Sequence, residues 1–138
     1  MHEKYERANK LSHEAIGGAI EVHRLKGPGL LEEIYEKCLM REFEIRGIPA
    51  KNQIPISLEY KGMKCEQILR LDAIVDDCLL IELKAVERIL PIHKAQLFSY
   101  MKLLDVPIGL LINFHEPVLK QGISRLMLPN ANIPDVDF

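Results

Sequence analysis

Three charged residues interrupt an otherwise apolar part of the chain, and together they have the chemistry of a metal site. Asp72 ends one apolar segment, and Glu82 and Lys84 lie within the next. Side chains two residues apart on a strand point to the same side. Two carboxylates are hard oxygen ligands for Mg²⁺, and a nearby ammonium can stabilise charge that develops on phosphorus. The set therefore supplies what Mg²⁺-dependent phosphodiester hydrolysis requires: Asp72 and Glu82 fit the role of metal ligands, and Lys84 can place an ammonium near the attacking water or the phosphate.

The segments that carry these charges predict a hairpin. The apolar run from residue 79 to 86 is typical of a strand buried on both faces. Asp76 and Asp77 favour a tight turn before it, which would bring Asp72 toward Glu82 and Lys84. Burying a charge without a partner costs several kcal/mol of folding free energy, so we expect these charged residues to have a functional role. An internal ion-pair network and an exposed edge strand are the alternatives.

Other polar residues could join this site. Glu32 and Tyr35 lie three apart near the start of a predicted helix, and His23 precedes a glycine-proline break. Glu32 is either a further carboxylate for the metal or a favourable charge at the helix start. Tyr35 and His23 are candidate accessory residues, and His23 is otherwise a capping or packing side chain.

A later predicted helix carries a second polar stripe. His93, Gln96 and Tyr100 lie along one of its faces. Gln96 and Tyr100 could orient water or contact a phosphate, and His93 is a further accessory candidate. The alternative is a polar rim with Tyr100 half-buried through its ring.

The elements that would position these residues follow from hydrophobic periodicity and turn signals. They predict an α/β (α+β) fold of order ααβββαβ(β), with a central mixed sheet of four or five strands flanked by helices. The strands at 79–86 and 108–114 are expected to pair in parallel through a right-handed crossover. We expect one domain over residues 1–128 and a loose C-terminal tail over 129–138. The predicted helices are 5–24, 30–46 and 91–104, and the predicted strands are 54–60, 64–75, 79–86, 108–114 and 123–128.

Composition narrows the function classes. The chain has 138 residues, a net charge of −2, and no apolar run near the length of a membrane span. Its N-terminus is polar and is not expected to be a signal peptide. The three cysteines are odd in number and form no C-x-x-C pair, which predicts reduced thiols packed in the core of a cytoplasmic protein. They are Cys38, Cys65 and Cys78. The slight acidity weakens a nucleic-acid interpretation, although a local basic patch stays open, formed by Lys61, Lys64, Arg88, Lys94, Lys102, Lys120 and Arg125.

Several short blocks occur in order between about residues 8 and 128. They are Glu21-Val-His23, the segment 27–36, Arg70-Leu-Asp72, Ile81-Glu-Leu-Lys-Ala85, Gln96-Leu-Phe-Ser-Tyr100 and the segment 109–114. In this order the blocks resemble the GxxExxY protein family, which is grouped with the PD-(D/E)xK nuclease superfamily. The resemblance implies a restriction-endonuclease-like core. It also implies that Asp72 and Glu82 are metal ligands, Lys84 the catalytic lysine, Glu32 the helix carboxylate, and Gln96 with Tyr100 the Q-x-x-x-Y element. One departure is that no proline precedes Asp72.

The sequence thus predicts a nuclease-like enzyme that uses Mg²⁺ or Mn²⁺ to hydrolyse phosphodiester bonds in nucleic acid, DNA rather than RNA. A non-catalytic module that binds nucleic acid or protein and keeps the fold is the main alternative. A purely structural network of buried charges is the third. No membrane partner is expected, and a homodimer stays open.

Overall fold

The computed structural model describes residues 1–134 of the chain. Its elements follow the predicted order and confirm the α+β class. The final strand that the prediction left optional is present. The helices are α1 (Tyr5–Lys26), α2 (Glu32–Arg46), α3 (Pro91–Leu104) and the short 3-10 helix η1 (Leu119–Gly122). The strands are β1 (Ala50–Tyr60), β2 (Met63–Val75), β3 (Leu79–Lys84), β4 (Ile108–Asn113) and β5 (Ile123–Met127).

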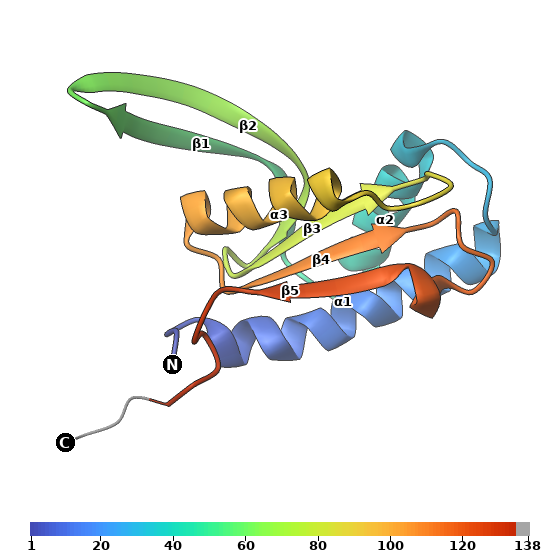
Figure 1. The fold of residues 1–138 in the computed structure, drawn as a ribbon. Helices are drawn as coiled ribbons and strands as arrows, with labels where there is room; N and C mark the ends of the chain where they lie inside the picture. The colour runs from blue at the N-terminus through green and yellow to red at the C-terminus, as the bar shows by residue number, and fades with distance from the viewer. Residues whose placement is uncertain (135–138) are drawn as a thin grey trace.

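The five strands form one mixed sheet in the order β1-β2-β3-β4-β5. β3 and β4 pair in parallel, as predicted, and the other neighbours are antiparallel. Helices α1 and α2 cover one face of the sheet and α3 covers the other (Figure 1). Alternate residues of β3 divide between two apolar clusters: Ile81 packs toward α1 and α2, whereas Leu80 packs toward α3.

Local sequence signals explain where the elements begin and end. Pro91 occupies the first turn of α3, where its missing N–H costs nothing. Gly47 follows α2 in the left-handed conformation. Lys61 and Gly62 both have positive φ and turn β1 into β2, and Asp76 and Asp77 do the same between β2 and β3.

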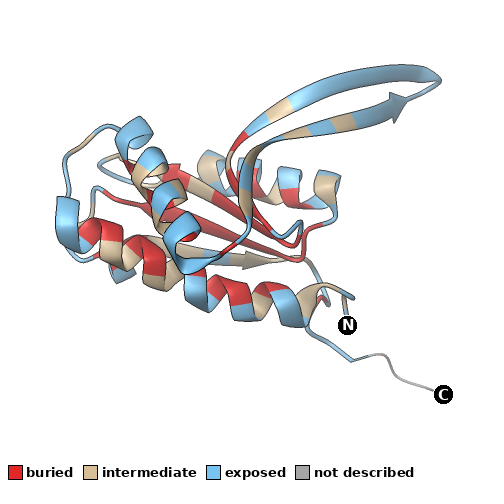
Figure 2. Ribbon diagram, turned by 180° about the vertical axis from the view of Figure 1, so that it is seen from behind, coloured by how far each residue is buried: buried red, intermediate tan, exposed pale blue. Residues whose placement is uncertain are grey.

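The β1–β2 hairpin is a long arm that projects beyond the sheet (Figures 1 and 2). Its outer half is exposed, and only residues 73–75 of β2 pair with β3. At the base of the arm the register shifts, because Lys51 pairs with Ile74 but Gln53 pairs with Arg70. Residues 71–73 of β2 therefore oppose only Asn52 of β1. This bulge bends β2 away from β3, and Asp72 lies within it.

Three sequence expectations need correction. β3 ends at Lys84 rather than at residue 86, because the buried amide of Asn113 takes both backbone groups of Val86. Cys65 is exposed on the arm instead of packed in the core. The expected loose tail is anchored at first, since Ala131 is buried and its carbonyl accepts the N–H of His2.

The rest of the tail, residues 135–138, lies outside the described residues. The domain boundary at residue 128 stays a prediction. None of the helices within residues 1–134 combines the length and the apolar character that a membrane crossing needs.

Candidate active site

The site begins where β2 leaves β3. The last β2–β3 pair on this side joins Ala73 to Ile81, and the next β2 residue, Asp72, turns its carboxylate toward β3. Asp72 Oδ2 accepts the backbone N–H of Leu83 at 2.8 Å. The side chain thus satisfies a strand donor at the point where the two strands separate. This hydrogen bond fixes the Asp72 carboxylate beside the strand that carries Glu82 and Lys84.

Glu82 and Lys84 lie on the same side of β3, two residues apart as the sequence pattern predicts. The Lys84 Nζ atom is 4.0 Å from Glu82 Oε2, and the side chains are 22% and 23% exposed. This distance is at the limit of an ion pair, and no hydrogen bond joins the two groups in the described part of the chain. The structure therefore brings the three predicted residues together without pairing Glu82 tightly with the lysine.

Burial and the neighbouring negative charges both raise the pKa values of the two carboxyl groups. Burial, followed by the negative charge of Asp72, raises the pKa of Glu82 to about 7, and Lys84 only partly offsets the two effects. Burial also raises the pKa of Asp72, while the N–H of Leu83 acts in the opposite direction. A tight internal ion pair would lower the pKa of a carboxyl group. The raised pKa of Glu82 instead shows that Lys84 does not outweigh burial and the neighbouring carboxylates.

Helix α2 adds two carboxylates to this field. The charge of Glu32, an exposed residue in its first turn, raises the pKa of both Asp72 and Glu82. Glu36 contributes to the raised pKa of Glu82 and lies 3.5 Å from Arg70, with its side chain 13% exposed. Sequence analysis missed Glu36, although its place four residues after Glu32, on the same helical face, was the available signal.

These residues fit a hard divalent cation better than a closed metal centre. Among residues 1–134, no group of three or more histidine, cysteine or acidic side chains is arranged to hold a metal ion. Zinc sites usually need three or four such protein ligands. Mg²⁺ is usually bound by one or two carboxylates together with waters and substrate phosphates. Asp72 and Glu82 have the number and chemistry of ligands for that second arrangement.

The structure places Gln96 and Tyr100 on α3 but gives them no direct link to the three residues. Gln96 is exposed and Tyr100 is 36% exposed, while Leu97 and Met101 on the same helix face the sheet. No hydrogen bond or ion pair within the described chain joins Gln96 or Tyr100 to Asp72, Glu82 or Lys84. Their polar groups remain available to a substrate.

Both histidine candidates have structural partners. His23 is buried, and its Nε2 donates to the carbonyl of Glu116 at 2.8 Å. His93 Nδ1 accepts the backbone N–H of Leu90 at 3.0 Å and so caps α3. Neither histidine bonds to the Asp72–Glu82–Lys84 group in the described structure.

Tyr35 holds the loop that leads into α2. Its hydroxyl donates to the carbonyl of Gly27 at 2.6 Å and accepts the N–H of Leu30 at 3.0 Å. Its fully buried ring stacks on Phe114 with centroids 4.4 Å apart. Tyr35 thereby ties Phe114, the residue after β4, to the first turn of α2, which carries Glu32. It supports the site through position rather than contact.

We expect Tyr35→Phe to lower the free energy of unfolding by about 1–3 kcal/mol, because both backbone groups lose their partner. Urea denaturation of the two proteins measures this difference. Tyr60→Phe is the control, since Tyr60 is 61% exposed at the tip of the arm and should be neutral. A Tyr35→Phe protein as stable as wild type would show that the hydroxyl does not hold this loop.

Comparison with protein families identifies the fold. The model of the PD-(D/E)XK nuclease superfamily matches residues 9–126, which include Asp72, Glu82 and Lys84 and most of the sheet. Comparisons with curated proteins and with solved structures return no significant match. Nucleases of this superfamily generally use divalent metal ions, in agreement with the chemistry of the two carboxylates. The chain belongs to the PD-(D/E)XK nuclease superfamily.

Proposed function

We propose that this protein is a Mg²⁺- or Mn²⁺-dependent nuclease that hydrolyses phosphodiester bonds, in DNA rather than RNA, and that it belongs to the GxxExxY family. The observation that carries the proposal is that two partly buried carboxylates, Asp72 and Glu82, lie together beside Lys84. Glu82 and Asp72 lie together, and the pKa of Glu82 is about 7 although an ammonium is 4.0 Å away. A divalent cation held by both carboxylates would offset the cost of their burial and their mutual repulsion.

Each residue has a defined role in this proposal. Asp72 and Glu82 would hold the ion, which when bound would activate water and polarise a phosphoryl oxygen. Lys84 stabilises the negative charge that develops on the phosphate. The Leu83 N–H keeps the Asp72 carboxylate oriented, and Glu32 contributes a further carboxylate from α2.

The residues outside this group are assigned by their surroundings. Gln96 and Tyr100 are exposed on α3 and can contact the substrate. His23, Tyr35 and His93 support the surrounding backbone. A homodimer and a cytoplasmic location stay predictions; sedimentation of the purified protein tests the first.

A cleavage assay tests the proposed activity against the binding-module alternative. Labelled single- and double-stranded DNA and RNA are incubated with the protein and Mg²⁺, Mn²⁺ or EDTA. We expect metal-dependent cleavage of DNA that Glu82→Gln abolishes. Binding without cleavage in either metal would support the non-catalytic module, and cleavage that persists in Glu82→Gln would exclude Glu82 from the reaction.

A further inference from the structure

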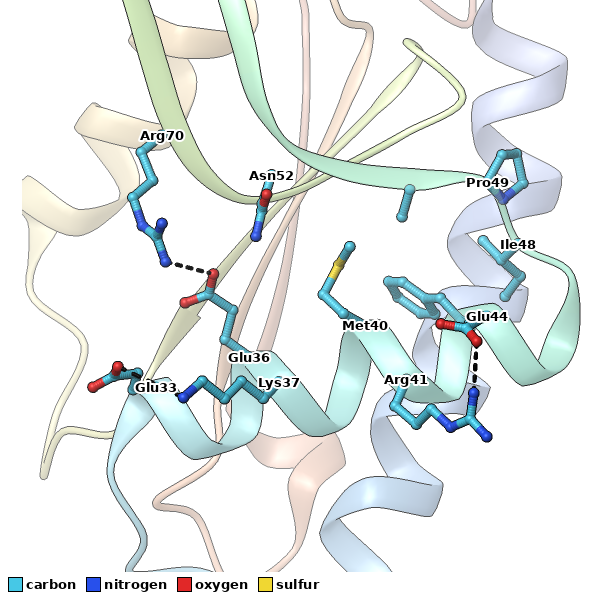
Figure 3. Close-up of a pocket in the computed structure, with 12 residues that line it drawn as sticks. Glu33, Glu36, Lys37, Met40, Arg41, Glu44, Ile48, Pro49, Asn52 and Arg70 are labelled. Atoms are coloured by element: carbon cyan, nitrogen blue, oxygen red, sulfur yellow. Dashed lines mark hydrogen bonds and ion pairs between the residues drawn. The ribbon is translucent and has the colours of Figure 1, made fainter.

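A pocket of about 580 Å³ lies between α2 and the base of the arm (Figure 3). Its apolar lining comes from α2, from the short connection after it and from the first residue of β1, where the chain enters the arm. Phe43 and Ile48 are buried in its floor, and the other members are partly or fully exposed. This apolar lining consists of Met40, Phe43, Ile48, Pro49 and Ala50.

The charged side chains around the pocket cancel one another. Three acidic and three basic residues line it, and they form three ion pairs, so the pocket carries no net charge. A pocket built for a phosphate alone would carry an excess of positive charge. Its rim and floor instead suit a neutral, flat group with apolar faces. The pairs are Lys37–Glu33 at 4.0 Å, Arg41–Glu44 at 2.6 Å and Arg70–Glu36 at 3.5 Å.

Asn52 offers the pocket a free amide. It lies on β1 opposite the bulge of β2, and its side chain extends from the arm into the space above α2 (Figure 3). Within residues 1–134 no hydrogen bond engages this amide. An amide presents a donor and an acceptor side by side, which matches the edge of a nucleobase.

The pocket adjoins the candidate active site. Glu36 lies on α2, one helical turn after Glu32, and lines the pocket. Arg70, its ion-pair partner, precedes Asp72 by two residues on β2. Because Arg70 lines the pocket and Asp72 follows it on the same strand, we expect a strand seated in the pocket to extend along β2 toward the Asp72 carboxylate.

We propose that this pocket receives one unpaired nucleobase of the nucleic acid next to the phosphodiester that is cut. The inference rests on the proposed function and adds a substrate class, namely strands with an unpaired nucleotide at the cleavage position. A base within a continuous duplex is stacked and paired and would have to be extruded first. Single-stranded bases, in contrast, are recognised by apolar contact with their faces and by hydrogen bonds to their edges.

Binding of a short fluorescein-labelled DNA strand, single or annealed to its complement, tests this assignment. Fluorescence anisotropy is measured with Ca²⁺ in place of Mg²⁺ to keep the strand intact. We expect Asn52→Ala to weaken single-strand binding about 5- to 10-fold, and Ala50→Phe, which fills the pocket, about 10-fold or more. Duplex binding should change less than about 2-fold. Gln67→Ala, an exposed amide further along β2 that does not line this pocket, should bind like wild type.

The outcomes separate the inference from the function on which it rests. A wild-type protein that neither binds nor cleaves any nucleic acid overturns both. A wild-type protein that cleaves, with pocket variants that bind single strands like the Gln67→Ala control, overturns the inference alone and leaves the pocket to a protein partner. Equal losses for single strand and duplex also overturn it, because they indicate a backbone contact. Asn52→Ala removes an amide that has no hydrogen-bond partner in the described structure, so this variant should fold. It therefore still tests the inference if Ala50→Phe does not fold.

Discussion

Lys84→Met should reduce cleavage by about 10²-fold or more while the protein keeps a melting temperature close to that of wild type. Methionine retains the apolar stem of lysine and removes only the charge. Little stability should be lost, because the Lys84–Glu82 separation is 4.0 Å and the pKa of Glu82 is already about 7. When the lysine is removed, Glu82 can take up a proton instead of remaining a buried, unpaired charge.

Single-turnover cleavage and thermal unfolding, measured on the same preparation, check this result. Lys10→Met is the control, because Lys10 is exposed on α1 and should affect neither quantity. A structural role predicts a different result, namely destabilisation by roughly 3–5 kcal/mol as expected when a buried ion pair loses one partner. A Lys84→Met protein that cleaves normally, or one that does not fold, would contradict the catalytic assignment.

Glu82→Gln should stabilise the metal-free protein by about 2–3 kcal/mol above pH 7. The pKa of Glu82 rises from its ordinary value of 4.5 to about 7 in the folded state. The folded protein therefore binds this proton more tightly than the unfolded chain does. That contribution to stability is fully present below pH 4.5, declines as the pH rises toward 7, and is lost above it. A neutral glutamine removes this pH dependence.

Urea denaturation in EDTA at pH 5 and pH 8 measures the effect. The difference between the variant and wild type should be small at pH 5 and near its maximum at pH 8. Glu59→Gln, at an exposed position on the arm, should stay within about 0.5 kcal/mol of wild type at both pH values. If Glu82→Gln is less stable than wild type at pH 8, Glu82 is compensated by Lys84 and the site is a structural ion pair.

Local patterns in the sequence were sufficient to predict much of the fold. The spacing of Glu82 and Lys84 on one strand, the turn at Asp76 and Asp77, and the start of α3 at Pro91 each depend on neighbouring residues. The alternation of side chains on a strand, the fixed φ of proline and the turn preference of aspartate are properties of the local backbone. The predicted elements therefore match the structure closely, apart from their ends.

Features that depend on distant contacts could not be predicted in the same way. The contact of Glu36 with Arg70 joins α2 to β2 across 34 positions of the chain. The bulge around Asp72 arises from the pairing of β1 with β2, and Asn113 ends β3 from the neighbouring strand. Tyr35 fell among the candidate site residues because a polar group near a carboxylate looks functional in sequence. Only its stacking on Phe114 and its loop hydrogen bonds reveal the supporting role.

The central claim is that Asp72 and Glu82 form a divalent metal site beside Lys84. Titration calorimetry with Mn²⁺ is its most direct test. The comparison is between wild type and an Asp72→Asn, Glu82→Gln double variant, in which an asparagine oxygen can still accept the Leu83 N–H. We expect weak binding by wild type, tightened when a phosphorothioate DNA strand supplies further oxygen ligands, and no binding by the double variant. Equal Mn²⁺ binding by both proteins would contradict the assignment.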